Sequence, residues 1–325
     1  MARPGTGPKL KPSEKGRLIF MQAFGFELKH GATVLSARTL PDLTPAADEV
    51  IIDVQAVGLN NRERMARRGA VPGDFNVLGS DVAGTVTALG RSVADITIGE
   101  RVLVRTTHGD ATQVRAPARD VVVLPRALSF EQAAGMITPG ITAYRAVAVF
   151  TRLQPGHTVV IKGASGGVGL LVVQLAKARD VHVIGVASGN HRNQVLTAGA
   201  DEFFAYDTEN HVAALDGRAD IVFNVALNGI NGQDDVAMVR PGGQIISVAH
   251  REPYSDKPVQ FTHIHPLAVP NDHTILTELV PLFADGLLKL PIGTLFPFTA
   301  AGFAAAHDLL PSPHEGRIVV SAADD

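Results

Sequence analysis

The sequence predicts a mixed α/β protein in two parts: a β-rich first part shaped as a small barrel, and a second part built on a doubly wound parallel sheet. From residue 21 to about residue 125, short β-branched runs alternate with glycine turns, as they do in small barrels. After Ser129, runs with strand character alternate with helical segments. That order implies a parallel sheet with right-handed crossovers.

The composition suits a globular protein large enough for two domains. The chain has 325 residues, of which 46% are hydrophobic and 19% charged, so it can bury a substantial core. Its net charge of -3 argues against a nucleic-acid or membrane-surface binder, and no run approaches the roughly 18 apolar residues of a membrane span. The absence of cysteine excludes disulfides, catalytic thiols and cysteine-ligated zinc, and is consistent with a cytoplasmic protein.

In the first part, residues 1–20 are predicted to be an extension, because they are polar and rich in proline, glycine and lysine. Strand-forming runs follow at residues 50–58, 81–90 and 120–124. Residues 60–68 are rich in charged side chains and are predicted to form a short helical segment. Ser129 is predicted to be a helix N-cap. We expect Pro139-Gly140 to interrupt this helix and residues 142–150 to continue it.

The second part is organised around a strand at residues 158–162, a glycine-rich turn, a helix and a second strand at residues 181–187. The turn holds no side chain larger than valine. Its backbone can therefore approach a pyrophosphate, while the helix N-terminus presents free N–H groups to the anion. We predict dinucleotide contacts from the turn residues Ala164, Ser165, Gly166, Gly167 and Val168. A glycine-rich β-α-β loop that binds nothing is the alternative, since the first glycine of the usual G-x-G-x-x-G pattern is an alanine here.

Further strands are predicted at residues 219–225 and 244–249, and an amphipathic helix at residues 273–288. The last strand, residues 316–321, is expected to return to the first domain. No internal repeat is visible in the sequence.

Seven short motifs occur in a fixed order and together identify a family. They are residues 56–60 (AVGLN), 78–84 (LGSDVAG), 129–134 (SFEQAA), 140–144 (GITAY), 163–169 (GASGGVG), 198–201 (AGAD) and 240–243 (RPGG). By these motifs the chain resembles the medium-chain dehydrogenase/reductase superfamily, in its zinc-independent quinone oxidoreductase branch. Residues 60–63 and 109–112 also resemble enoyl reductase domains of polyketide synthases.

The resemblance implies a GroES-like β-barrel catalytic domain interrupted by a Rossmann domain. On this basis residues 21–139 form the first part of the catalytic domain, residues 140–286 the Rossmann domain, and residues 287–325 the segment that returns to the barrel. The resemblance also implies NADPH as hydride donor in the cleft between the domains. A homodimer formed around residues 259–267 is a further implication.

The choice of NADPH over NADH has a physical argument of its own. An NAD site uses a carboxylate at the end of the second strand to bind the ribose 2′-hydroxyl. Residues 188–192 contain no carboxylate, whereas Ser188, His191 and Arg192 suit a 2′-phosphate. Tyr206 stands where relatives place a tyrosine near the adenosine. The alternative is that His191 and Arg192 are solvated residues at a helix start.

Five more residues are predicted to contact the cofactor, because they stand where relatives contact ribose and nicotinamide or at the bridge between the domains. They are Thr142, Asn224, Ala226, Val248 and Ala249. The carboxyl ends of parallel strands are where such sheets bind ligands, which supports the last four. Thr142 has an alternative role as a residue that caps its own helix.

Three residues are candidates for the chemistry itself. Asn60 stands where zinc-dependent relatives carry a cysteine ligand, and Glu63 replaces a family aspartate; a turn residue is the alternative for Asn60. His108 could donate a proton at neutral pH, or could be an exposed loop histidine. No metal site is predicted, because His263 and His265 lack further ligands at suitable spacing.

These observations predict a zinc-independent, NADPH-dependent reductase that transfers hydride to a quinone or an α,β-unsaturated carbonyl compound. A trans-acting enoyl-thioester reductase of polyketide or fatty acid metabolism is the alternative among enzymes. A non-catalytic NADPH-binding sensor on the same fold is the alternative outside enzymes, because fold does not dictate function.

Overall fold

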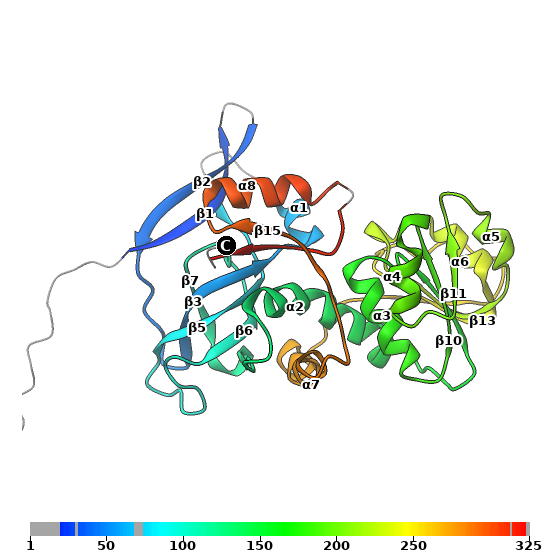
Figure 1. Cartoon of the computed structure of the whole chain (residues 1–325), viewed down its shortest axis with the longest axis horizontal. Coiled ribbons are helices and arrows are strands. Elements are labelled where there is room, and N and C mark those ends of the chain that lie inside the picture. The colour runs from blue at the N-terminus through cyan, green and yellow to red at the C-terminus, as the bar shows by residue number, and fades with distance from the viewer. Residues whose placement is uncertain (1–19, 30–31, 68–73, 313, 323–325) are drawn as a thin grey trace, which may run out of the picture.

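The first lobe of the computed structural model holds two sheets (Figure 1). The structure describes residues 20–29, 32–67, 74–312 and 314–322, so residues 1–19 of the predicted extension lie outside it. A seven-stranded sheet has the order β15-β16-β3-β5-β6-β8 with β7 paired to β3, and a three-stranded sheet has the order β2-β1-β4. Their bounds are β1 (Phe20–Lys29), β2 (Ala32–Pro41), β3 (Glu49–Gly58), β4 (Asn76–Val77), β5 (Asp81–Leu89), β6 (Arg101–Arg105), β7 (Gln113–Pro117), β8 (Val122–Val123), β15 (Ile292–Pro297) and β16 (Arg317–Ser321).

The end of the chain lies in this first lobe. β16 pairs antiparallel with β3, so that Val319 lies opposite Gly58 and Ser321 opposite Ala56, and β15 lies parallel to β16. The helix α8 (Ala300–Leu309) packs beside β15 and carries Phe303 into the barrel core. Residues more than two hundred positions apart in the sequence therefore form one wall of the barrel, where β3 ends and β16 begins.

The second lobe is a six-stranded parallel sheet in the order β11-β10-β9-β12-β13-β14 (Figure 1). The strands are β9 (Thr158–Lys162), β10 (His182–Ala187), β11 (Glu202–Ala205), β12 (Ala219–Asn224), β13 (Val239–Ser247) and β14 (Gln260–His263). Residues 159–161 are fully buried because helices cover both faces of the sheet. The predicted parallel sheet is confirmed. Its strand order reverses at β9, and sheets of this kind bind ligands in the crevice beside the carboxyl ends of the strands at this point, here β9 and β12.

The helices of this lobe are α3 (Gly167–Lys177), α4 (Arg192–Thr197), α5 (His211–Ala214) and α6 (Gly232–Met238). The helix α7 (Asp272–Ala284) ends earlier than the predicted residue 288. The reason is a Schellman turn: Gly286 has φ +70°, its N–H bonds Phe283, and the N–H of Leu287 bonds Leu282. No helix among the described residues is long and apolar enough to span a membrane.

The helix α2 (Phe130–Tyr144) packs against strands of the barrel and against α3 of the second lobe. Ser129 caps it as predicted, with Gln132 completing a capping box. The predicted interruption at Pro139-Gly140 is wrong, because α2 continues through both residues into a π-helical turn at Arg145–Val149. Pro139 cannot donate to the carbonyl of Gly135, and Arg317 Nε donates to that oxygen instead at 3.0 Å.

Candidate active site

The glycine turn between β9 and α3 is shaped by close backbone contacts. A Cβ added to Gly169 would lie 2.0 Å from the carbonyl oxygen of Gly163, and one added to Gly163 would lie 2.8 Å from Ala226 Cα. Only glycine therefore fits at these two positions. The N-cap residue Gly166 has no side-chain cap, so the first N–H groups of α3 stay available to an anion.

The five predicted turn residues differ in their exposure to solvent. Ala164 is buried beneath the turn. The others lie partly or fully exposed above it, and they are Ser165, Gly166, Gly167 and Val168. The turn therefore has the free N–H groups and the small side chains that a dinucleotide pyrophosphate requires.

Acidic residues lie beside the predicted phosphate site at the end of β10. Gly189 N–H donates to both carboxylate oxygens of Asp207, at 2.9 and 3.3 Å. Arg192 pairs with Glu209 at 2.9 Å, and its guanidinium lies 4.7 Å from the ring centre of Phe203. Neither acid was predicted to lie here, because both follow the third strand of the sheet and not the second.

The other predicted residues of this region are Ser188, His191 and Tyr206. The Ser188 hydroxyl bonds the side chain of Asn190, and Tyr206 is 58% exposed. His191 lies in the short helical turn of residues Gly189–His191, which precedes α4. All three therefore lie at the carboxyl ends of β10 and β11, on the side of the sheet where the glycine turn lies.

The end of β12 is held by a buried ion pair. Asn224 is fully buried, and its amide donates to Asp235 at 2.6 Å and to the carbonyl of Ile230 at 3.0 Å. Lys162 Nζ lies 2.6 Å from Asp235 and 2.8 Å from the carbonyl of Asn231. Burial raises the pKa of Asp235 to about 6 although Lys162 and Asn224 oppose the shift. Asn224 thus fixes the loop of residues 226–231.

Ala226, Val248 and Ala249 are partly exposed at the ends of β12 and β13. Val248 N–H bonds the carbonyl of Asn224 at 3.1 Å, and Ala249 N–H bonds the Ser247 hydroxyl at 3.0 Å. These residues lie where β12 and β13 end, and their contact with a cofactor stays a prediction. Thr142 lies inside α2 and donates its hydroxyl to the Thr138 carbonyl one turn earlier at 2.8 Å, so it does not cap the helix.

Asn60 lies buried at the end of β3, just before α1 (Asn61–Arg67), with both ends of its amide engaged. Its Nδ2 donates to Asp81 Oδ2 at 3.0 Å, and its Oδ1 accepts from Arg317 Nη2 at 2.8 Å. Arg317 also donates to the carbonyl of Leu59 at 2.7 Å. Burial lowers the pKa of Arg317, an effect that Asp81 and Glu63 oppose.

Glu63 lies on α1 with 5% of its surface exposed. It accepts a hydrogen bond from the N–H of Asn60, and its Oε1 lies 3.0 Å from the Ser80 hydroxyl oxygen. Burial first, and then the nearby carboxylates of Asp81 and Asp110, raise the pKa of Glu63 to about 8. The structure therefore provides a buried acid whose pKa suits proton donation near neutral pH.

Asp81 is the centre of this acidic cluster. It is fully buried and accepts from Thr138 N at 2.8 Å and from Thr138 Oγ1 at 2.7 Å, in addition to Asn60. Asp81 belongs to a family motif in the sequence but was not assigned a role. The signal that could have found it is an acid at the start of an otherwise apolar strand.

His108 takes a different position from the other two catalytic candidates. It is exposed, with φ +61°, in the turn after β6. The neighbouring Asp110 is buried and lies 3.3 Å from Nε2 of His307 on α8. Burial raises the pKa of Asp110, and the contact with His307 opposes this effect.

Arg317 joins the acidic cluster to the glycine turn. A Cβ added to Gly167 would lie 2.9 Å from Arg317 Cδ and 3.7 Å from its Nη1. The guanidinium is therefore adjacent to the N-terminus of α3 while it bonds Asn60 in the barrel. Nothing in the sequence indicated this contact, because Arg317 comes from the returning segment.

Histidines gather at the ends of β13 and β14, where the ring centres of His250 and His263 lie 4.1 Å apart and those of His263 and His265 lie 6.2 Å apart. Within the part of the chain that the structure describes, no group of three or more His, Cys, Asp or Glu side chains is placed to hold a metal ion.

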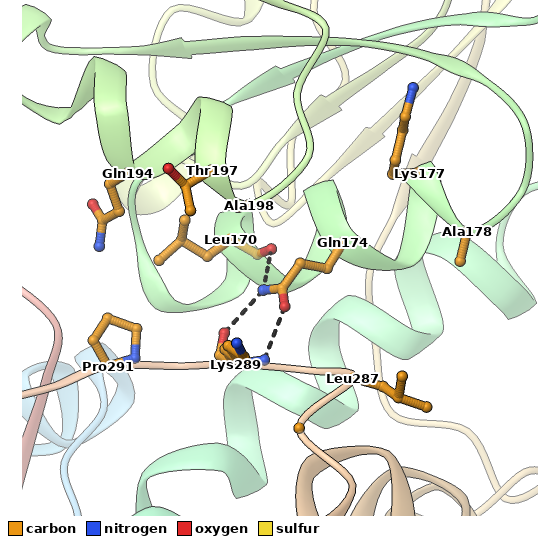
Figure 2. Close-up of a pocket in the computed structure, with 11 residues that line it drawn as sticks. Leu170, Gln174, Lys177, Ala178, Gln194, Thr197, Ala198, Leu287, Lys289 and Pro291 are labelled. Carbon is orange, nitrogen blue, oxygen red and sulfur yellow. Dashed lines mark hydrogen bonds between the residues drawn. The ribbon is translucent and has the colours of Figure 1, made fainter.

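Figure 2 shows a pocket of about 480 Å³ on the flank of α3 and α4, where Gln174 bonds the backbone of Lys289. The pocket contains none of the predicted catalytic or cofactor residues.

Known proteins resemble the chain in both lobes. The family profile described as "Alcohol dehydrogenase GroES-like domain" matches residues 46–155, and the one described as "Zinc-binding dehydrogenase" matches residues 167–276. Human quinone oxidoreductase is 33% identical over 259 residues, which are 76% of this chain and 75% of that protein. The chain belongs to the medium-chain dehydrogenase/reductase superfamily, in its quinone oxidoreductase-like branch. The GroES-like barrel and the Rossmann sheet are the two lobes described above.

Other members of the superfamily are more distant. The human synaptic vesicle membrane protein VAT-1 homolog is 29% identical over 239 residues, which are 71% of this chain but 60% of that protein. Escherichia coli quinone oxidoreductase, solved with NADPH, has a TM-score of 0.79 at 23% identity and covers 92% of this chain and 99% of its own. The CurK enoyl reductase has a TM-score of 0.79 at 23% identity over 92% of this chain and 98% of its own. These two structures share the fold.

Proposed function

We propose that this protein is an NADPH-dependent reductase that transfers hydride to a quinone or an α,β-unsaturated carbonyl compound without zinc. The observation that carries the proposal is the position of Arg317, which lies against the N-terminus of α3 and bonds Asn60 in the acidic cluster. A cofactor held at the glycine turn would thus lie close to a buried acid. The quinone oxidoreductases among its relatives support this reaction type.

The residues of the second lobe fit a dinucleotide. The N–H groups at the start of α3 and the Arg317 guanidinium would face the pyrophosphate, and the ends of β12 and β13 would border the nicotinamide ribose. When bound, the dihydronicotinamide supplies the hydride. The chain itself orients the reactants, excludes water and stabilises the negative charge that develops on the substrate oxygen.

The preference for NADPH rests on the end of β10. Residues 188–192 offer a hydroxyl, an imidazole and a guanidinium and no carboxylate. The pair of Arg192 with Glu209 is largely exposed, and such pairs contribute only about 0–1 kcal/mol, so a 2′-phosphate can compete for the guanidinium.

We propose that the protein binds no catalytic zinc, because the cysteine side chains that would serve as zinc ligands are missing. Catalytic zinc sites in proteins use three side-chain ligands, commonly cysteine or histidine, and this chain has no cysteine. Asn60, at the position of a cysteine ligand in zinc-dependent relatives, is bonded to Asp81 and Arg317. Elemental analysis should find no stoichiometric zinc; one zinc per chain would contradict this part of the proposal.

The function is tested by NADPH oxidation against a panel of quinones and enones, with NADH measured in parallel. We expect turnover with at least one compound and a higher kcat/KM for NADPH than for NADH. Tight NADPH binding without turnover would favour a sensor. Equal kcat/KM values, or a preference for NADH, would overturn the cofactor assignment.

A trans-acting enoyl-thioester reductase is the second candidate, favoured by the resemblance of residues 109–112 to polyketide synthase enoyl reductases. Asp110 in this segment lies within the electrostatic reach of Glu63. The panel should therefore include a crotonyl thioester. A kcat/KM for the thioester well above that for every quinone and simple enone would favour this candidate.

We also propose that the protein is a cytoplasmic homodimer formed along β14. This strand lies at the edge of the six-stranded sheet and pairs only with β13 among the described strands, so its outer backbone groups are available to a second copy. Sedimentation analysis should give the mass of two chains. A monomer at micromolar concentration would contradict the proposal.

A further inference from the structure

Ser80 lies between two buried acids and has a single hydrogen to share. Its Oγ is 3.0 Å from Glu63 Oε1 and 3.2 Å from Asp81 Oδ1. If both acids were ionised, one of these contacts would join two acceptors without a hydrogen between them. A proton on Glu63 removes the conflict, because Glu63 then donates to Ser80 and Ser80 donates to Asp81.

The hydrogen-bond partners indicate which acid keeps the proton. Asp81 accepts three further hydrogen bonds, from Asn60 Nδ2, Thr138 N and Thr138 Oγ1, which together stabilise a carboxylate. Glu63 accepts one further bond, from the N–H of Asn60 to Oε2, which leaves Oε1 as the protonated oxygen. The pattern fits a carboxylic acid at Glu63 and an ion at Asp81.

The charged groups around this cluster agree with that assignment. From the barrel, Asp110 adds a third acid near Glu63, and His307 on α8 lies against Asp110 and not against Glu63. From β16, Arg317 is a single cation that donates hydrogen bonds to Asn60 and to two backbone carbonyls. One guanidinium cannot neutralise three buried carboxylates, so at least one of them retains a proton.

We propose that Glu63 and Ser80 form a proton chain beside Asp81, in which Ser80 hands a proton to the reduced substrate and Glu63 replaces it. Ser80 is half-buried, whereas Glu63 and Asp81 are 5% and 0% exposed, so Ser80 is the member that solvent or a substrate can reach. This inference rests on the proposed reductase function and assigns the proton donor of the same reaction.

The step balances as follows. Hydride adds to the β-carbon of an enone and brings two electrons, and the π pair moves to give an enolate. The O–H bond of Ser80 breaks as its hydrogen forms the new C–H bond at the α-carbon, or an O–H bond in the case of a quinone. At the same time the O–H bond of Glu63 breaks and its proton restores Ser80. The Glu63 carboxylate then takes a proton from water.

Three variants separate the two members of the proton chain. Glu63→Gln keeps a donor toward Ser80 and an acceptor for Asn60 N–H but cannot release a proton. Ser80→Ala removes the carrier, and Ser80→Thr restores a hydroxyl. We expect kcat to fall about 100-fold in Glu63→Gln and Ser80→Ala, with partial recovery in Ser80→Thr. NADPH affinity, measured by fluorescence titration, should stay unchanged in all three.

The pH profile supplies a second readout. A proton donor is active while it is protonated, so kcat of the wild type should fall as the pH rises through about 8, the pKa of Glu63. The remaining activity of Glu63→Gln should lack this limb. Ser92→Ala, in an exposed turn of the barrel, is the matched control and should behave as the wild type. Full kcat in Ser80→Ala would overturn the proposal.

Infrared spectroscopy of the protein without cofactor tests the chain independently of turnover. The difference spectrum between wild type and Glu63→Gln at neutral pH should contain the carbonyl band of a protonated carboxylic acid, and Ser80→Ala should shift its frequency. Absence of the band would overturn the proposal even in an active enzyme. A wild type that turns over no substrate would instead refute the reductase function, while the band would still decide the state of Glu63.

Discussion

Arg317 donates from Nη2 to Oδ1 of Asn60 at 2.8 Å, across a sequence separation of 257 residues. The same guanidinium bonds the carbonyl of Gly135 that Pro139 leaves without its helical partner. It therefore holds together the end of β3, the middle of α2 and the start of β16. The Arg317 guanidinium therefore both supports α2 where it continues through Pro139 and fixes the position of Asn60.

Removal of this guanidinium should destabilise the protein. Arg317→Met keeps the length of the side chain but leaves two carbonyl groups and the Asn60 amide oxygen without donors. Each such loss costs about 1–3 kcal/mol, so the three together should lower the free energy of unfolding in urea by at least about 3 kcal/mol. Arg317→Lys should recover part of the loss. An unchanged unfolding midpoint in Arg317→Met would show that water replaces the guanidinium.

Because Glu63 is protonated in the folded protein, the free energy of unfolding should depend on pH. Its pKa of about 8 in the folded protein exceeds the ordinary value of 4.5, so between these values the folded form holds a proton that the unfolded chain has released. The contribution of Glu63 is therefore complete at low pH and is lost as the pH rises through this window, by at most about 1.4 kcal/mol per pH unit.

Glu63→Gln should lack this slope. Its free energy of unfolding, measured in urea across the window, should rise relative to the wild type as the pH increases. A constant difference between the two proteins from pH 4.5 to pH 8 would mean that Glu63 is ionised in the folded state.

The acids beside the phosphate site should limit the affinity for NADPH. Glu209→Gln frees Arg192 from its ion pair, and the exposed position of the pair sets the expected gain at about 2- to 5-fold in NADPH Kd, with little change for NADH. Asp216→Asn removes one charge before the amino end of β12 and is the control for net charge. Equal gains in both variants would mean that long-range charge, and not Arg192, is responsible.

The buried pair of Lys162 and Asp235 should behave differently from a surface ion pair. Asp235→Ala leaves the buried Lys162 ammonium with only the more distant Asp234 carboxylate at 4.0 Å, and the loss of one partner of a buried pair costs about 3–5 kcal/mol. The double variant Lys162→Met, Asp235→Leu removes both charges and should unfold at a higher urea concentration than Asp235→Ala. If the double variant is the less stable of the two, the pair contributes more through its bonds to the loop of residues 226–231 than it costs in desolvation.

The sequence predicts the elements of this fold because their signals are local. The glycine turn, the buried strands of the parallel sheet and the Ser129 cap each depend on neighbours a few positions away. Pro139 misled the prediction because its compensating partner, Arg317, lies far along the chain. Helix continuity at a proline depends on what reaches the free carbonyl, and local sequence does not contain that information.

The same contrast between local signals and long-range contacts applies to the candidate site. Asn60 and Glu63 are three positions apart in the sequence and were predicted together, but Asp81, Ser80 and Arg317 join them only through the barrel. At the other end of the crevice, the missing carboxylate after β10 was visible in the sequence. The acids that approach from the next strand, Asp207 and Glu209, were not, because parallel pairing of β10 with β11 brings them there.

The central claim is that this chain transfers hydride from a nicotinamide to a carbon or oxygen of a small substrate. Reduction of an enone with NADPH deuterated at C4 tests it most directly, because deuterium on the β-carbon of the product does not exchange with water. One stereoisomer of the labelled cofactor should deliver one deuterium per product molecule, as read by mass spectrometry. A reduced product without deuterium from either stereoisomer would contradict the claim.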